Sequence, residues 1–90
     1  MNKVEIYTKS YCHYCSRAKE LLRIKEVPFT EYDVTSDPIK EQEMRERSGR
    51  NTVPEIFVDD KLLGGCDDLF ELDEKGELNR LLGLKTNRGG

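Results

Sequence analysis

The stretch Tyr11-Cys12-His13-Tyr14-Cys15 places two thiols three positions apart in the chain. A short alternating apolar run precedes it, and a segment whose apolar residues have helical spacing follows it. A Cys-x-x-Cys pair at a strand-to-helix turn is typical of a redox-active site. The stretch therefore predicts both thiol chemistry and the order of strand, turn and helix around it.

The composition predicts one small domain, which we expect to span 1–84 and to end in a frayed tail, 85–90. Ninety residues lie within the range of about 50 to 200 residues that single domains cover. Charged residues make up 37% of the chain with both signs interspersed, which is typical of a folded surface. The net charge of −3 argues against nucleic acid as a partner.

Several features of the sequence favour a cytoplasmic protein with no membrane contact. No apolar stretch approaches the roughly 20 residues of a membrane span. The N-terminus lacks the apolar region of a signal peptide. Three cysteines, an odd count, also fit poorly with a structural disulfide framework. We therefore expect thiols in a reducing compartment.

The spacing of apolar residues predicts the element order β-α-β-α-β-β-α. Strands are expected over 3–8, 29–34, 55–58 and 61–63, the last two joined by a tight turn at Asp59-Asp60. Helices are expected over 13–26, 37–48 and 66–74, with one more helical turn at 78–82.

The second expected helix has clear start and stop signals. Asp37 can cap free N–H groups, and Pro38 suits the first helical position. Gly49 suits the position just after the helix. Only Ile39 and Met44 are clear apolar anchors in this charged segment, so we expect the helix to lie shallowly on the sheet.

The two thiols of the Cys-x-x-Cys pair have different expected roles. The thiolate is the reactive species, and a free cysteine with a pKa near ~8.5 is mostly protonated at neutral pH. Cys12 lies at a helix N-terminus, where unpaired N–H groups and the helix dipole favour an anion, and Lys9 adds positive charge. We therefore expect Cys12 to be the exposed nucleophile. Cys15, one turn further, is the expected resolving thiol that releases a mixed disulfide from Cys12.

Two structural roles for the pair are disfavoured. A disulfide across so short a loop removes little unfolded-state entropy, about 2 kcal/mol at most. A structural zinc site needs four ligands. Only Cys66 and His13 remain as candidates, and His13 lies inside the loop, so we expect no metal.

Two other stretches each allow two interpretations. Thr52-Val53-Pro54 is either a plain loop before a strand or a loop whose cis Val53–Pro54 bond turns the Val53 backbone toward an extended peptide. In Gly64-Gly65-Cys66-Asp67-Asp68, the helix N-terminus can hold a carboxylate and Asp67 an ammonium, as on an α-amino acid end. Alternatively, the two aspartates only complement the helix dipole. The Cys66 side chain is expected to be a small, half-buried group.

To about Leu82, the chain resembles the small bacterial dithiol glutaredoxins. Three stretches carry the resemblance, and they are Ile6-Tyr7-Thr8-Lys9 running into Cys12-His13-Tyr14-Cys15, then Thr52-Val53-Pro54, then Gly64-Gly65-Cys66-Asp67-Asp68-Leu69. The resemblance implies an α/β thioredoxin-like fold, with a four-stranded mixed sheet in the order 2-1-3-4 and helices on both faces. It also implies a monomeric glutathione-dependent thiol–disulfide oxidoreductase that reduces protein–glutathione mixed disulfides and protein disulfides, ribonucleotide reductase among the plausible substrates.

The resemblance also implies a role for individual residues. Lys9 resembles the partner of the glutathione glycine carboxylate, and Tyr14 the aromatic residue beside the glutathione sulfur. Val53, before a cis Pro54, would pair its backbone with the cysteinyl part. Gly65, Cys66 and Asp67 resemble the clamp for the γ-glutamyl end. The implied glutathione site comprises Lys9, Tyr14, Thr52, Val53, Pro54, Gly65, Cys66 and Asp67.

One position departs from the family pattern, since His13 stands where the commonest motif has proline. A protonated imidazole there would stabilise the Cys12 thiolate and make the disulfide more oxidising. The alternative is a solvent-facing side chain with little effect. The departure leaves the redox potential open but not the class of activity.

Two alternative functions share the implied fold. One is an electron carrier reduced by thioredoxin reductase, against which the Gly65–Asp67 clamp argues, because such a carrier needs no glutathione site. The other is a dimer that holds an iron–sulfur cluster through Cys12 and glutathione. The second thiol and His13 argue against the cluster.

Overall fold

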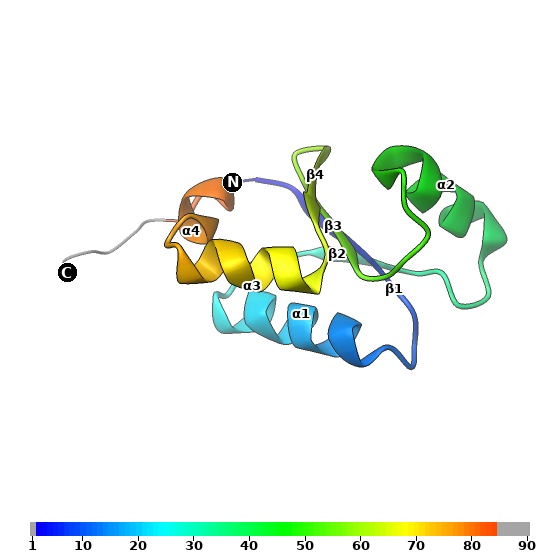
Figure 1. Ribbon diagram of the computed structural model, residues 1–90, viewed down its shortest axis with the longest axis horizontal. Coiled ribbons are helices and arrows are strands. Elements are labelled where there is room, and N and C mark those ends of the chain that lie inside the picture. The colour runs from blue at the N-terminus through cyan, green and yellow to red at the C-terminus, as the bar shows by residue number, and fades with distance from the viewer. Residues whose placement is uncertain (1, 85–90) are drawn as a thin grey trace.

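The computed structural model describes residues 2–84 of the chain, and its elements follow the expected order (Figure 1). The elements are β1 (Val4–Thr8), α1 (His13–Ile24), β2 (Thr30–Asp33), α2 (Pro38–Ser48), β3 (Glu55–Val58), β4 (Lys61–Gly64), α3 (Cys66–Glu74) and α4 (Leu78–Leu81). The expected tail, 85–90, lies outside the described residues.

The four strands form one mixed sheet in the order β2-β1-β3-β4, as the resemblance implied. β1 pairs with β2 in parallel and with β3 in antiparallel register, and β3 pairs with β4 in antiparallel register. β2 and β4 are therefore the outer strands. All residues of the central strands β1 and β3 are buried, because both faces of the sheet are covered there.

Alternate residues of β1 face two different apolar clusters. Ile6 packs on one face among residues of α1, α3 and α4, including Leu22 and Leu69. Tyr7 packs on the other face with Met44 of α2 and Phe57 of β3. Figure 1 shows the same arrangement, with α1 and α3 side by side and α2 apart from them across the sheet. The two faces of β1 thus place α1 and α2 on opposite sides of the strand that leads to the cysteines.

Helix α1 buries the predicted stripe and ends earlier than predicted. Its buried residues are Cys15, Ala18, Leu21 and Leu22. The helix was expected to reach Glu26 but ends at Ile24, because Glu26 takes a left-handed conformation with φ of 58°.

Helix α2 has the predicted boundaries. The Asp37 carboxylate accepts the Lys40 N–H at 3.0 Å and caps the N-terminus. Gly49 is left-handed, with φ of 74°, and its N–H donates to the Arg45 carbonyl at 2.7 Å. Of the two expected apolar anchors, Met44 is fully buried, but Ile39 is 79% exposed, so that prediction was wrong. The helix therefore needs contacts other than apolar ones to attach it to the sheet.

Arg47 supplies those contacts. Its guanidinium donates to the Tyr7 hydroxyl at 2.8 Å and to the Glu5 carboxylate at 3.0 Å, and it lies 4.0 Å from the centre of the Phe57 ring. Burial opposes ionisation of Glu5, but hydrogen bonds from Arg47 and Tyr32 outweigh it and hold the Glu5 pKa below its usual value. A polar, largely buried network thus takes the place of an apolar stripe on α2.

The turn between β3 and β4 also matches the sequence prediction. Asp59 and Asp60 both have positive φ, at 52° and 69°, as a two-residue hairpin turn that follows the strand twist requires. Aspartate tolerates this conformation better than most side chains. The hairpin leads β4 to Gly64, one residue further than expected, and so directly to the start of α3.

Replacement of Met44 should lower the free energy of unfolding far more than replacement of Ile39. Met44→Ala leaves a cavity under α2, so we expect the free energy of unfolding to fall by about 2–5 kcal/mol. Ile39→Ala, in the same helix, should change it by less than about 0.5 kcal/mol, because the side chain is exposed. Urea unfolding followed by circular dichroism measures both, and equal losses would contradict the packing of α2.

Candidate active site

The two thiols lie where β1 passes into α1, in a turn closed by the Cys12 N–H, which donates to the Lys9 carbonyl at 3.2 Å. Cys12 is extended, with φ of −93° and ψ of 115°, and is the N-cap of α1. Its sulfur accepts the Cys15 N–H at 3.2 Å. A side-chain sulfur thus takes the position of an ordinary capping oxygen, beside N–H groups that favour a negative charge.

The environments of the two thiols differ as predicted. Cys12 is half-buried, whereas only 1% of Cys15 is exposed. Burial, together with the contact with Cys12, raises the pKa of the Cys15 thiol to about 12. All three cysteines are free thiols in this structure. Cys12 is therefore the sulfur that a substrate can reach, and Cys15 is held protonated behind it.

The segment 52–54, distant from Cys12 in the sequence, lies beside the Cys12 sulfur in the structure. The Cys12 thiol lies 3.9 Å from the Val53 carbonyl oxygen and donates to it. The Val53–Pro54 peptide bond is cis, which is one of the two conformations that the sequence left open. The backbone of 52–54 therefore lies directly beside the reactive sulfur.

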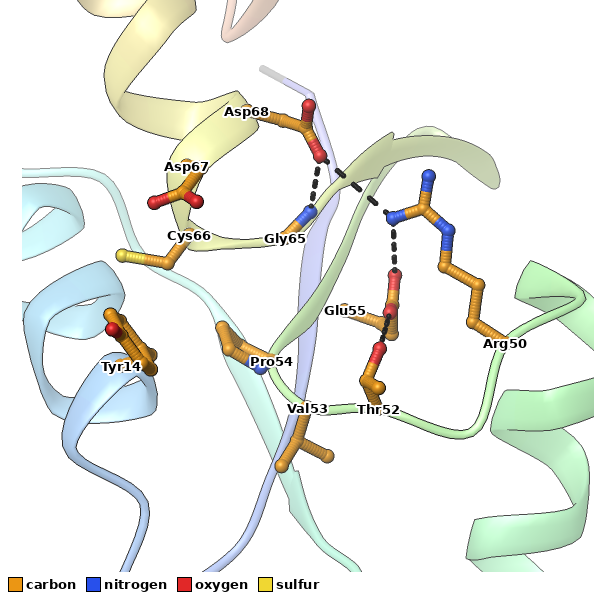
Figure 2. Close-up of a pocket in the computed structure, with 10 residues that line it drawn as sticks. All are labelled: Tyr14, Arg50, Thr52, Val53, Pro54, Glu55, Gly65, Cys66, Asp67 and Asp68. Atoms are coloured by element: carbon orange, nitrogen blue, oxygen red, sulfur yellow. Dashed lines mark hydrogen bonds and ion pairs between the residues drawn. The ribbon is translucent and has the colours of Figure 1, made fainter.

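An open pocket continues from Val53 to the start of α3 (Figure 2). Its volume is about 250 Å³, less than the roughly 300–1,000 Å³ of most ligand sites, which suits an extended ligand that stays partly in solvent. The residues that line it are Tyr14, Arg50, Thr52, Val53, Pro54, Glu55, Gly65, Cys66, Asp67 and Asp68. Every residue of the implied glutathione site except Lys9 is among them.

Lys9 lies outside the pocket lining. Its ammonium is 3.8 Å from the Glu41 carboxylate of α2, and each side chain is about one-third exposed or less. Lys9 is still at the Cys12 turn, where its carbonyl accepts the Cys12 N–H. In this structure the Lys9 ammonium therefore lies beside α2 rather than in the pocket.

Different constraints explain the two glycines before α3. A Cβ on Gly65 would come within 3.3 Å of the Pro54 carbonyl oxygen, so a side chain there would crowd the Pro54 loop. Gly64 has φ of 128°, and a Cβ on it would come within 2.3 Å of the Asp68 carboxylate. Gly65 thus lets the start of α3 lie against the loop that carries Val53, and Gly64 adopts the positive φ that precedes it.

The two aspartates of α3 have separate roles. Asp68 accepts the Gly65 N–H at 3.0 Å and caps the helix. For this residue the structure agrees with the interpretation in which the aspartates complement the helix dipole. Asp67 is exposed, lines the pocket and leaves its carboxylate facing solvent there (Figure 2). Cys66 is buried rather than half-buried, and burial raises the pKa of its thiol.

Sequence comparison agrees with this geometry. The protein-family model for glutaredoxin matches residues 4–63, which include both cysteines and the Val53 loop. The chain belongs to the glutaredoxin family. It is 54% identical to glutaredoxin 3 of Escherichia coli K12 over 82 residues, which cover 91% of this chain and 99% of the relative.

Solved structures give the same assignment. The glutaredoxin of Brucella melitensis is 50% identical, with a TM-score of 0.78, over 89% of this chain and 87% of the other. The buckwheat glutaredoxin–glutathione complex is 28% identical, with a TM-score of 0.83, over 91% of this chain and 77% of the other. As a glutaredoxin with a Cys-x-x-Cys pair, the chain is a thiol–disulfide oxidoreductase in general terms.

Residues 2–84 of this glutaredoxin lack two further features. None of the helices in that range combines the length and the apolar character that a membrane span needs. Within the same range, no group of three or more His, Cys, Asp or Glu side chains is arranged to hold a metal ion.

Sequence reasoning missed three charged residues of the glutaredoxin pocket: Arg50, Glu55 and Asp68. Glu55 is the first residue of β3, and only 1% of it is exposed. A glutamate directly after Pro54, in a strand whose other residues are all apolar, was the available signal. It indicated a carboxylate in a buried position beside the Val53 loop.

The His13 side chain is exposed, and its ring lies edge-on to Tyr14 with centroids 6.1 Å apart. This position agrees with the solvent-facing alternative.

We therefore expect His13→Pro to leave the pH profile of Cys12 alkylation close to that of the wild type, with alkylation rates measured from pH 5 to 9. A shift of the profile to higher pH in the variant would mean that the imidazole stabilises the thiolate.

Alkylation should also separate the three thiols of the reduced protein. We expect iodoacetamide at pH 7.5 to modify Cys12 first, because Cys15 and Cys66 are buried and their pKa values are raised. Mass spectrometry of peptides, sampled at the earliest times, measures the initial rate at each site. Initial modification of Cys15 as fast as that of Cys12 would contradict the assignment of the nucleophile.

Proposed function

We propose that this glutaredoxin is a glutathione-dependent oxidoreductase that reduces protein–glutathione mixed disulfides and protein disulfides. The observation that carries the proposal is the junction of nucleophile and pocket. The half-buried Cys12 sulfur lies 3.9 Å from the carbonyl oxygen of Val53, and Val53 lines a pocket that extends to the start of α3. The buckwheat glutaredoxin–glutathione complex, a structural neighbour, supports the choice of ligand.

Glutathione suits the pocket in both shape and charge. Its cysteinyl backbone would pair with the Val53 backbone, which puts its sulfur next to Cys12. Its γ-glutamyl carboxylate would accept N–H groups at the start of α3, which favours anions. The exposed Asp67 carboxylate would then meet the ammonium of the same ligand. Lys9 would bind the glycine carboxylate after leaving Glu41.

The reduction of a protein–glutathione mixed disulfide needs only Cys12. The Cys12 thiolate attacks the glutathione sulfur, and the protein leaves as a thiolate that takes up a proton. Cys12 is then linked to glutathione. A second glutathione thiolate attacks the bound glutathione sulfur, so that glutathione disulfide leaves and the Cys12 thiolate is restored.

The reduction of a protein disulfide needs Cys15 as well. Cys12 attacks one sulfur of the substrate, and Cys15 then attacks Cys12, which releases the substrate dithiol and leaves a Cys12–Cys15 disulfide. Two glutathiones reduce that disulfide. Cys15 must first lose its proton. Once Cys12 is in a mixed disulfide it has no negative charge, and one of the causes that raise the Cys15 pKa is gone.

We also propose a cellular location, protein partners and an oligomeric state for the protein. A site that works through free thiols suits the reducing cytoplasm. The protein partners would be glutathionylated proteins and enzymes with catalytic disulfides, such as ribonucleotide reductase, and the protein would act as a monomer.

Substitution of the resolving thiol tests the mechanism. We expect Cys15→Ser to keep the reduction of glutathionylated substrates and to lose the reduction of protein disulfides, because only the second reaction needs an attack on Cys12 from within the protein. Cys12→Ser, the matched control, should lose both. Both reactions can be followed by NADPH consumption with glutathione and glutathione reductase. Full activity of Cys15→Ser in both reactions would contradict the assigned role.

The same assay separates the two alternative functions. Turnover by the wild type with glutathione and glutathione reductase alone would exclude a carrier that depends on thioredoxin reductase. A colourless protein after anaerobic purification would count against an iron–sulfur cluster.

A further inference from the structure

Three charged side chains of the pocket have no role in the chemistry above, and together they connect the two ligand-binding segments (Figure 2). We propose that Arg50 and Glu55 are positioning residues that set the spacing between the Val53 loop and the start of α3, and so the affinity for glutathione. The proposal rests on the proposed function. It adds two residues that do not contact the reacting sulfurs.

Glu55 is the unusual member of the group. Its carboxylate is buried, and burial raises its pKa. One oxygen, Oε2, accepts the Thr52 hydroxyl at 3.0 Å. The other, Oε1, is buried without a hydrogen-bond partner among the described residues. A buried carboxylate with an unmatched oxygen is costly, so its nearest cation matters for the whole loop.

That cation is Arg50. Its Nη1 lies 3.7 Å from Glu55 Oε1 and 3.8 Å from Asp68 Oδ2, so one guanidinium nitrogen lies between two carboxylates. Both distances exceed a hydrogen bond, and the attraction is therefore electrostatic. The Arg50 side chain is about half exposed, but Glu55 is not, so water screens the Glu55 contact only in part.

Asp68 completes the connection. The same oxygen that faces Arg50 accepts the Gly65 N–H at 3.0 Å. Consecutive contacts therefore connect the Thr52 hydroxyl to the Gly65 backbone, through the side chains of Glu55, Arg50 and Asp68. We call this set the Arg50 bridge.

The Arg50 bridge spans the two halves of the ligand. One end is Thr52, next to the Val53 backbone proposed to pair with the cysteinyl part. The other end is Gly65, next to the N–H groups proposed to hold the γ-glutamyl carboxylate. The segments also lie close together directly, since a Cβ on Gly65 would come within 3.3 Å of the Pro54 carbonyl oxygen. The backbone contact therefore limits how closely the segments approach, and the ion pairs of Arg50 favour the spacing that the structure shows.

Substitution of either charge should weaken ligand binding, but the two should change stability in opposite directions. Arg50→Gln leaves a buried carboxylate with no cation beside it, which lowers stability. Glu55→Gln removes that buried charge, and its amide oxygen can still accept the Thr52 hydroxyl, so stability should not fall. A purely structural role would instead make stability and binding change together.

The test uses four proteins: the wild type, Arg50→Gln, Glu55→Gln and the double variant. With a glutathionylated peptide as substrate, we expect each single variant to raise KM about fivefold with kcat unchanged, which corresponds to roughly 1 kcal/mol. The double variant should also show a rise of about fivefold, rather than the roughly 25-fold of independent effects. Tm should fall in Arg50→Gln and return at least to the wild-type value in the double variant.

Arg23 and Glu20 provide matched controls. They form an exposed ion pair at 3.8 Å on α1, and the Arg23 side chain is exposed to a similar extent as that of Arg50. Arg23→Gln and Glu20→Gln should leave KM unchanged. Two results would overturn the Arg50 bridge, provided that the wild type is active. One is a wild-type KM in both Arg50→Gln and Glu55→Gln. The other is a KM in the double variant that rises by the product of the two single effects. Absence of wild-type turnover would instead overturn the proposed function.

Discussion

The hydrogen bond from the Cys15 N–H to the Cys12 sulfur is the contact on which the site depends. The first N–H groups of any helix have no partner within the helix. In this protein the Cys12 sulfur accepts one of them, so the group that caps α1 is also the thiol proposed as the nucleophile. The position of that atom follows from the sheet, because β1 is buried on both faces and determines where α1 starts. The packing of β1 in the core therefore also determines where the Cys12 sulfur lies.

The same contact divides the chemical work between the thiols. The sulfur that caps the helix stays at the surface, whereas the residue that donates the N–H lies in the apolar stripe of α1. The difference in exposure between Cys12 and Cys15 therefore follows from their positions at the start of α1. The ligand side is built differently, from the Val53 loop and the start of α3, with glycine where the backbones approach. In the proposed function, the N-terminus of α1 supplies the reactive thiol, and the Val53 loop and the start of α3 bind glutathione.

Periodicity and short motifs predicted most of the fold and much of the site. The stripe that buries Cys15 has helical spacing, and the motif order carried the sheet topology. Ile39 was misassigned because an apolar residue in a charged helix can face either side, and the contacts of Arg47 with the sheet decided which side faces in. Glu55 and Arg50 were missed because the alternation of a strand does not reveal which distant cation reaches a buried carboxylate. That pairing exists only once the loop after α2 is folded.

The position of β2 and β4 at the two edges of the sheet has a consequence for self-association. An outer strand offers unpaired backbone groups that can template aggregation, and charged side chains counter this. β2 presents Glu31 and Asp33, and β4 begins with the exposed Lys61. Both borders therefore resist the addition of a foreign strand. If the protein binds oxidised protein chains as proposed, charged sheet edges would reduce strand pairing with those substrates.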